Sequence, residues 1–153
     1  DIAGVTQNSL REQVGMVIHL GDIVAPFAAK RFADAARRVP FIAVFGNNDG
    51  ERAGLLSVVS EWGSLEDGPK RLEVDGKVLV LHHYPMAEAE VLTRFPDADY
   101  YLSGHTHERV DRRAGRLRLI NPGEACGWLY GEATAGILDP ARDDYRVLPL
   151  PDA

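Results

Sequence analysis

Residues that can bind metal ions follow four separate apolar runs of the chain. They are Asp22 in HLGD; Asn47, Asn48 and Asp49 in FGNND; His82 and His83 in LVLHH; and His105 and His107 in LSGHTH. Imidazole nitrogens, carboxylates and an amide oxygen form a mixed set that suits Mn, Fe, Ni, Co or Zn, and not a calcium cage of oxygens alone. Two cations about 3.5–4 Å apart need a carboxylate with two usable oxygens. Asp22 is the natural candidate for that bridge.

The apolar runs before these residues have the composition of buried strands. In open α/β sheets, ligand sites form outside the carboxyl ends of the strands. If the four runs are parallel neighbours, their polar ends converge. The runs are Gly15–Asp22, Pro40–Gly50, the second half of Lys70–His83, and DYYLSG before His105.

The rest of the sequence predicts the elements that would hold these strands. Helical patterns cover Ala25–Val39, Arg52–Trp62 and Ala87–Phe95, and Asp75-Gly76 predicts a hairpin turn within Lys70–His83. Three late strands are expected in GRLRLINPG, ATAGILDP and DYRVLPL. Alternating strands and helices imply a largely parallel sheet, and the strand-rich last third implies a second sheet. An α/β sandwich of two sheets with helices outside is the simplest packing.

Composition limits the classes of protein that this chain can be. Its 153 residues suit one domain, 1–153, with 45% hydrophobic and 26% charged residues. The net charge of −6 argues against a broad nucleic-acid-binding face, and no apolar run is long enough to cross a membrane. The single cysteine, Cys126, cannot form an internal disulfide, so we expect a cytoplasmic protein.

Each candidate residue also has a structural interpretation. Asp22 could cap a helix that begins near Pro26, GNND could be an ordinary turn, and His82 could be a hydrogen-bonded histidine at a strand end. His105 and His107 would point to opposite faces of a true strand, so a loop is needed to bring both to one site. We interpret His19 as a buried core residue, and His83 as either a structural residue or one that supports the metal ligands from behind. Four signals in sequence order nevertheless favour one shared site.

The ordered motifs GD (Gly21-Asp22), GNND (Gly46–Asp49), His82 after an apolar strand, and GHTH (Gly104–His107) resemble the calcineurin-like metallophosphoesterase superfamily. The closest likeness is to its small, single-domain, YfcE-like phosphodiesterases, and it extends through GNNDGER, GHTHERV and INPGEACGWLYGEATAGILD. The resemblance implies a four-layer α-β-β-α sandwich of two mixed sheets. It also implies two divalent transition metals, Mn first, and hydrolysis of a small phosphoester by a metal-bound hydroxide. Relatives of this kind often pair as homodimers.

The resemblance also implies roles for single residues. It assigns metal ligands to Asp1, Asp22, Asn47, His82, His105 and His107. Asn48 stands where many relatives carry histidine, so it could orient the phosphate but cannot act as a general acid. Asp49 would support the site from behind.

The start of the chain departs from the family pattern. The family opens with Asp-x-His, and here Ala3 takes the place of that histidine, which leaves the second metal one ligand short. The family also carries an apolar strand before that aspartate, so we expect a strand to precede Asp1. The departures keep two alternatives open: a protein-binding scaffold like a retromer subunit that has this fold, or a metal-dependent binding or sensor module.

Overall fold

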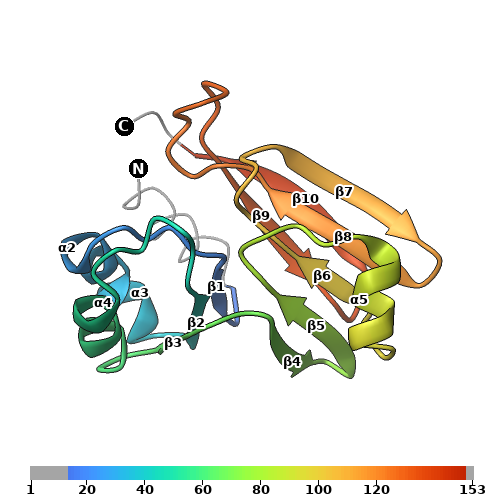
Figure 1. Cartoon of the computed structure of the whole chain (residues 1–153), viewed down its shortest axis with the longest axis horizontal. Helices are drawn as coiled ribbons and strands as arrows, with labels where there is room; N and C mark the ends of the chain where they lie inside the picture. The colour runs from blue at the N-terminus through green and yellow to red at the C-terminus, as the bar shows by residue number, and fades with distance from the viewer. Residues whose placement is uncertain (1–13, 151–153) are drawn as a thin grey trace.

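The computed structural model describes residues 14–150 and contains two main sheets (Figure 1). The first sheet has the order β1-β2-β3 with all strands parallel, and consists of β1 (Val17–His19), β2 (Phe41–Val44) and β3 (Ser64–Glu66). The second has the order β4-β5-β6-β8-β7, and consists of β4 (Lys70–Val74), β5 (Lys77–Leu81), β6 (Tyr100–Leu102), β7 (Arg109–Ala114) and β8 (Leu117–Pro122). Its three inner strands are parallel, and its two edge strands are antiparallel to their neighbours.

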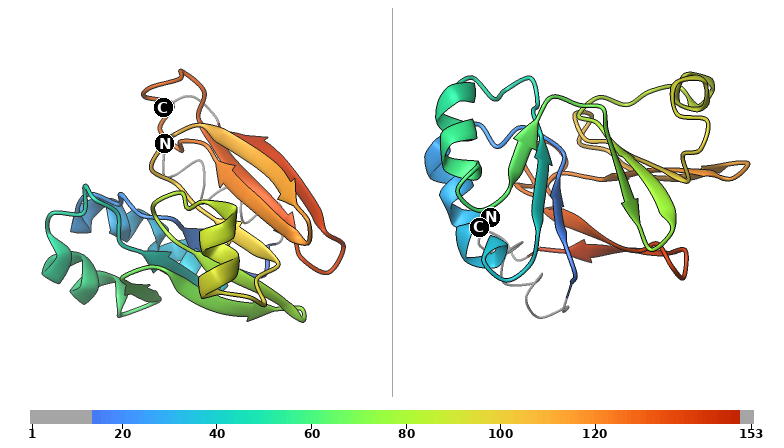
Figure 2. Two further views of the ribbon diagram at one scale, coloured as in Figure 1. Left: turned by 45° about the vertical axis from the view of Figure 1, so that its right-hand side comes forward. Right: turned by 90° about the horizontal axis from the view of Figure 1, so that it is seen from below.

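Helices lie on the outer faces of the two sheets (Figures 1 and 2). The first sheet is covered by α2 (Pro26–Ala29), η1 (Lys30–Phe32), α3 (Ala33–Ala36) and α4 (Arg52–Val59), and the second by α5 (Glu88–Arg94). A hairpin of β9 (Thr134–Asp139) and β10 (Asp144–Pro149) packs against the core between the sheets. The predicted two-sheet α/β sandwich with helices outside is therefore confirmed. None of the helices within residues 14–150 has the length and apolar content needed to cross a membrane.

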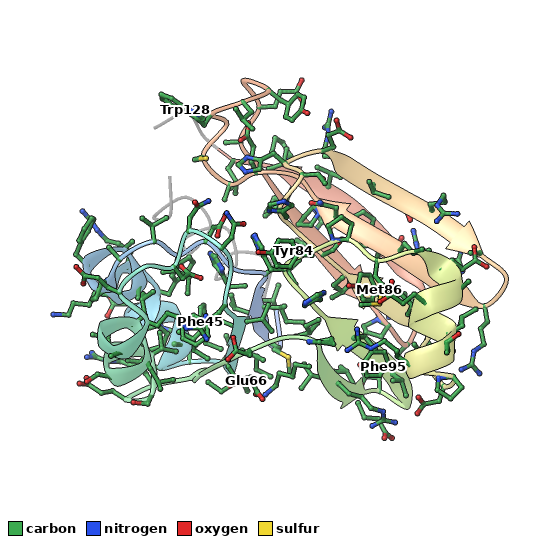
Figure 3. The ribbon with its side chains drawn as sticks, viewed as in Figure 1. Phe45, Glu66, Tyr84, Met86, Phe95 and Trp128 are labelled. Atoms are coloured by element: carbon green, nitrogen blue, oxygen red, sulfur yellow. The ribbon has the colours of Figure 1, made fainter. Side chains whose placement is uncertain are left out.

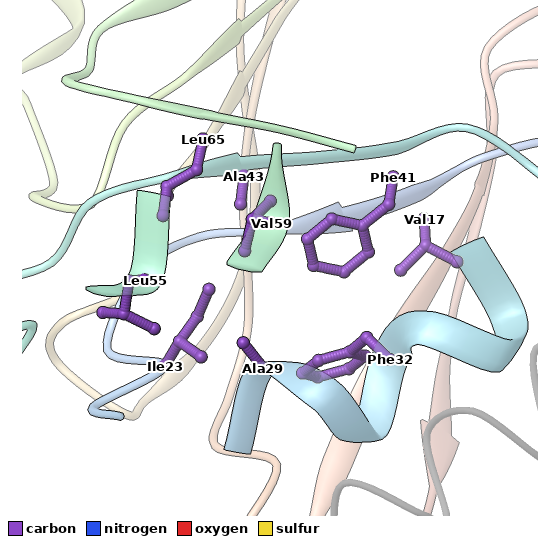
Figure 4. Close-up of a cluster of buried hydrophobic side chains, with 9 residues drawn as sticks. All are labelled: Val17, Ile23, Ala29, Phe32, Phe41, Ala43, Leu55, Val59 and Leu65. Carbon is purple, nitrogen blue, oxygen red and sulfur yellow. The ribbon is translucent and has the colours of Figure 1, made fainter. Parts of the chain in front are cut away.

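Three apolar clusters hold the layers together. Under the N-terminal helices, the Phe32 ring lies 5.2 Å from the Phe41 ring, and Val17 and Leu55 belong to the same cluster (Figure 4). Val44, Leu79, Leu81 and Leu102 are among the residues that fill the space between the sheets, and Val80, Val91 and Tyr101 are among those that lie under α5. Successive residues of β5 thus go to different clusters, because side chains alternate across a strand.

Some predicted elements match the observed ones and others differ. The hairpin around Asp75-Gly76 is confirmed, with both residues at positive φ. The helix expected over Ala25–Val39 is a series of three short helical segments that ends at Ala36. The strands β3 and β7 were not predicted, because β3 has only three residues and β7 (RVDRRA) carries charge on an exposed sheet edge.

Candidate metal centre

Two glycines let the loops after β1 and β2 touch. A Cβ on Gly46 would lie 2.2 Å from Asp22 Oδ1 and 2.4 Å from the Asp22 amide nitrogen. A Cβ on Gly21, whose φ is +100°, would lie 2.6 Å from His83 Nδ1. Only residues without a side chain allow so close an approach. The loops are therefore held together at the position where Asp22 is presented.

Asp49 is the polar anchor of these two loops. Its side chain is buried, and its carboxylate accepts hydrogen bonds from three backbone N–H groups: Asp22 (3.1 Å), Val24 (2.7 Å) and Gly46 (2.7 Å). Both carboxylate oxygens are thereby occupied by the main chain. The geometry gives this buried carboxylate a positioning role rather than a catalytic one, in agreement with the expectation that Asp49 supports the site from behind.

Three donor atoms converge at the carboxyl ends of β2, β5 and β6. Asn47 Oδ1 lies 2.8 Å from His83 Nε2 and 2.9 Å from His105 Nδ1, and the two ring nitrogens are 3.2 Å apart. Asp22 Oδ2 lies 3.6 Å from His83 Nε2. We call Asp22, Asn47, His83 and His105 the histidine cluster. The structure therefore brings together three of the residues that the sequence predicted, and His83.

His82 and His83 have exchanged the places that we expected from the sequence. The His82 ring points away from the cluster, with Nδ1 3.0 Å from the Tyr101 hydroxyl, which in turn donates to the Tyr84 carbonyl at 2.8 Å. Burial is the main cause of the lowered pKa of His82. His83 follows Leu79 and Leu81 in alternation, so it faces the space between the sheets. The structure places His83 in the cluster and His82 on the α5 side.

His105 and His107 lie in a loop, as their i, i+2 spacing requires, but they have different partners. Both take left-handed φ values, 65° and 62°. His107 Nδ1 lies 2.6 Å from the buried carboxylate of Glu124. Glu124 follows the apolar run of β8 just as the other polar residues follow theirs, so the same sequence rule could have found it. Asp1, the other residue assigned with His107, lies outside the described residues.

Asn48 contacts the carboxylate that the cluster shares. Its backbone N–H donates to Asp22 Oδ1 at 2.8 Å, and its side-chain Nδ2 donates to Asp22 Oδ2 at 2.9 Å. Its side chain is otherwise exposed. Asn48 therefore places an exposed side-chain amide, hydrogen-bonded to Asp22, next to the histidine cluster.

The donor spacing matches what a cation requires. Bonds of about 2.1 Å at right angles put two ligand atoms about 3 Å apart, close to the 2.8–3.2 Å spacings in the cluster. No three His, Cys, Asp or Glu side chains of residues 14–150 already form a closed cage. Asn48 hydrogen-bonds both carboxylate oxygens of Asp22, and Asn47, which lies beside the two histidines, offers an amide oxygen. If Asn48 released Asp22, its carboxylate would be available as a further ligand.

The hydrogen bonds of His83 are also compatible with a bound cation. Its Nδ1 lies 2.8 Å from the Leu20 carbonyl, which only accepts, so Nδ1 carries the proton. In the neutral form of the ring, Nε2 holds a lone pair directed at Asn47 Oδ1, which is also an acceptor. In that form a cation between or beside the two acceptors would stabilise them. The residues present therefore fit a bound metal ion.

Tyr84 and His19 pack beside the histidine cluster and the loop of Asp22, respectively. The Tyr84 ring, 43% exposed, lies 4.7 Å from the His105 ring and 5.0 Å from the His83 ring, in the centre of the molecule as drawn (Figure 3). His19 packs edge-on against Phe32 and accepts a hydrogen bond from the Gly21 amide at 3.2 Å. Burial lowers the pKa of His19 to about 4. His19 is thus neutral near pH 7 and supports the loop of Asp22 from the core side.

Comparison with known proteins identifies the family. The family model described as the calcineurin-like phosphoesterase superfamily domain matches residues 3–143. The chain belongs to the calcineurin-like phosphoesterase superfamily. This is a family of metal-dependent hydrolases. The resemblance stated from the sequence motifs is therefore confirmed.

Individual relatives agree with this assignment. This phosphoesterase is 38% identical over 143 residues to Phosphodiesterase MJ0936 of Methanocaldococcus jannaschii, covering 91% of this chain and 84% of that protein. A solved archaeal phosphodiesterase matches with a TM-score of 0.87 and 35% identity, over 97% of this chain and 91% of that one. YfcE, a phosphoesterase from E. coli, shares the fold with a TM-score of 0.65 and 17% identity, over 98% and 92% of the two chains. Vacuolar Protein Sorting 29 from Cryptosporidium parvum also shares the fold, with a TM-score of 0.62 and 14% identity, over 93% and 87%.

Proposed function

We propose that this chain is a metal-dependent phosphodiesterase that hydrolyses a small phosphoester at a dinuclear divalent-metal site. The observation that carries the proposal is the convergence of Asn47 Oδ1, His83 Nε2 and His105 Nδ1 within 3.2 Å of one another. The 38% identical relative, which is named a phosphodiesterase, supports the same activity.

The proposed ligand set has one change from the set predicted by the motifs. Asn47, His83 and His105 would hold one cation, with His83 in the place first given to His82. His107 and Asp1 would hold the other, and Asp22 would bridge the two. Mn is the first expectation, and the same donor types also suit Ni, Fe, Co or Zn. Bound divalent cations supply an activated water and neutralise the charge that builds on the phosphoryl group.

The chain's own residues would position the substrate and keep the site rigid. The Asn48 amide can turn from Asp22 to donate a hydrogen bond to a phosphoryl oxygen. Asp49 keeps the loops of Asp22 and Asn47 in register through three backbone hydrogen bonds. Ring contacts from Tyr84 restrict the movement of His83 and His105. Such preorganisation places the reacting groups before the substrate arrives.

The adjacent histidines offer a matched test. His83→Ala should lose at least about 100-fold in Mn-dependent hydrolysis of bis(p-nitrophenyl) phosphate, because second-shell losses alone reach that size. Metal analysis should show fewer Mn ions per chain. His82→Ala, one residue away, should keep the wild-type metal content. Wild-type activity and metal content in His83→Ala would contradict the proposal.

Metal content also separates this proposal from the protein-binding scaffold. Two cations per chain support the dinuclear hydrolase, whereas none at saturating Mn would favour the scaffold. Metal binding without turnover would favour the sensor module. A homodimeric assembly and a cytoplasmic location stay predictions of the sequence.

A further inference from the structure

One buried carboxylate joins His107 to the loop between β8 and β9. Glu124 is 5% exposed and sits two residues after β8. Its Oε2 lies 2.6 Å from His107 Nδ1 and 3.9 Å from Cys126 Sγ. Its Oε1 accepts hydrogen bonds from the backbone N–H groups of Leu129 and Tyr130, both at 2.8 Å. One oxygen of Glu124 therefore contacts His107, and the other holds the backbone of the loop between β8 and β9.

We propose that Glu124 is a positioning residue that fixes the tautomer of His107, an inference that rests on the proposed function of His107 as a metal ligand. A carboxylate can only accept, so the proton of a neutral His107 must be on Nδ1. Nε2 then keeps its lone pair and is available to a cation. A carboxylate behind a ligating histidine orients the ring and raises its basicity.

The loop around Glu124 fixes the position of its carboxylate. One oxygen is held by the Leu129 and Tyr130 amides, so the other is directed at His107. The two backbone amides are supplied by a tight loop, in which Gly127 and Gly131 both take positive φ and the Gly131 amide donates to the Gly127 carbonyl. The loop exposes 82% of Trp128, which projects from the ribbon in Figure 3.

Because one oxygen of Glu124 contacts His107 and the other holds the loop, the substitution Glu124→Gln can separate the two effects. In Glu124→Gln, the side-chain oxygen can still accept from Leu129 and Tyr130, so the loop keeps both hydrogen bonds. The amide NH₂ then faces His107 Nδ1, which must accept. The proton of a neutral His107 moves to Nε2, the atom that a cation would need. The variant therefore changes the tautomer while preserving the fold.

The tautomer can be read without any metal. In the metal-free full chain at pH 8, two-bond ¹H–¹⁵N spectra of the histidines should show His107 as Nδ1–H in the wild type and Nε2–H in Glu124→Gln. Glu132→Gln is the matched control, because Glu132 is an exposed acid of the same loop that pairs with Arg109 at 2.9 Å. That control should keep the wild-type tautomer. An Nε2–H His107 in the wild type would overturn the inference, whether or not the variant folds.

Metal titration supplies the second measurement. Isothermal titration with Mn²⁺ should show about 10–100-fold weaker binding of one cation in Glu124→Gln. Binding of the other cation and the thermal unfolding midpoint should stay as in Glu132→Gln. Unchanged Mn²⁺ affinity together with an unchanged tautomer would overturn the positioning role. A wild type that shows the Nδ1–H tautomer yet binds no Mn²⁺ would instead contradict the proposed function alone.

Discussion

Two polar clusters lie at opposite ends of the second sheet, and they differ in how their charges are balanced. The histidine cluster lies at the carboxyl ends of β5 and β6, where Asp22 and Asn47 reach it from loops of the first sheet and Asn47 Oδ1 lies 2.8 Å from His83 Nε2. At the amino ends of β6 and β8, buried Arg118 donates to both oxygens of Asp111, at 2.7 and 2.8 Å, and to the side chain of Asp143 at 3.2 Å. Tyr100 also donates to Asp143, at 2.7 Å. We call Arg118, Asp111, Asp143 and Tyr100 the arginine cluster.

The polar groups of the arginine cluster stabilise the fold, whereas we propose that those of the histidine cluster bind a cation. In the arginine cluster, hydrogen bonds from Tyr100 and Arg113 are the main causes that lower the pKa of Asp143 to about 2. Every strong donor there meets an acceptor within the chain. The histidine cluster contains no arginine or lysine. The first arrangement is a finished structural contact, whereas the second is the site at which we propose that a cation binds.

The largest expected effect comes from breaking the arginine cluster. Arg118→Met should lower the free energy of unfolding by about 3 kcal/mol, because it leaves the Asp111 carboxylate without its arginine and removes one of the donors to Asp143. The value lies at the lower end of the usual range since Asp111 and Asp143 keep contact with water. Arg113→Met, whose side chain is 49% exposed, should cost less than about 1 kcal/mol. Urea unfolding measures both, and equal losses would show that Arg118 has no special role.

Adding a cation should stabilise the other end of the sheet. Mn²⁺ at 100 times its dissociation constant should raise the free energy of unfolding by about 2.7 kcal/mol. Asn47→Ala should lose this increment, and Arg118→Met should keep it. Thermal melts with and without Mn²⁺ are the measurement. An increment that disappears in Arg118→Met instead would mean that the two clusters are not independent.

A smaller effect should follow from filling the space between the loops of the histidine cluster. Gly46→Ala puts a methyl group onto Asp22 and should cost about 2 kcal/mol, as overpacking does. Mn²⁺ binding should weaken in the same variant because Asp22 must move. A Cβ on Gly50, four residues on, meets nothing within 4 Å, so Gly50→Ala is the matched control. Chemical denaturation that gives both variants the same stability would contradict the tight contact.

A further prediction concerns acid, which should affect the two ends over different pH ranges. The unfolded chain protonates its histidines near pH 6.5, but folded His19 does so near pH 4, so stability falls as pH drops from 6.5 to 4. Asp143 titrates near 3.8 when unfolded and near 2 when folded, so its contribution is lost between pH 4 and 2. His19→Asn should flatten the first slope and Asp143→Asn the second, as metal-free unfolding midpoints would show. Identical pH profiles would refute the assignment.

Much of the fold could be predicted because its signals are local. Asp75-Gly76 specifies a hairpin turn by backbone chemistry alone, and the polar residues at strand ends indicated one edge of the sheets. The choice between His82 and His83 could not be made in this way. Both faces of β5 are apolar, with Leu79 and Leu81 on one and Val80 on the other, so the alternation does not tell which face meets the first sheet. That depends on the placement of α5, a tertiary contact.

The left-handed backbone of the site has a consequence for anyone who tries to make this protein more robust. Asp22 (φ 59°), Val24 (φ 74°), His105 and His107 all take a conformation that disfavours side chains by about 1 kcal/mol or more each. A stability screen blind to chemistry would select glycine at these positions first. Two of its best hits would delete members of the histidine cluster, and a third would delete His107. A thermostabilised catalyst from this scaffold therefore has to be engineered with Asp22, His105 and His107 held fixed, whereas Val24 can be changed to glycine.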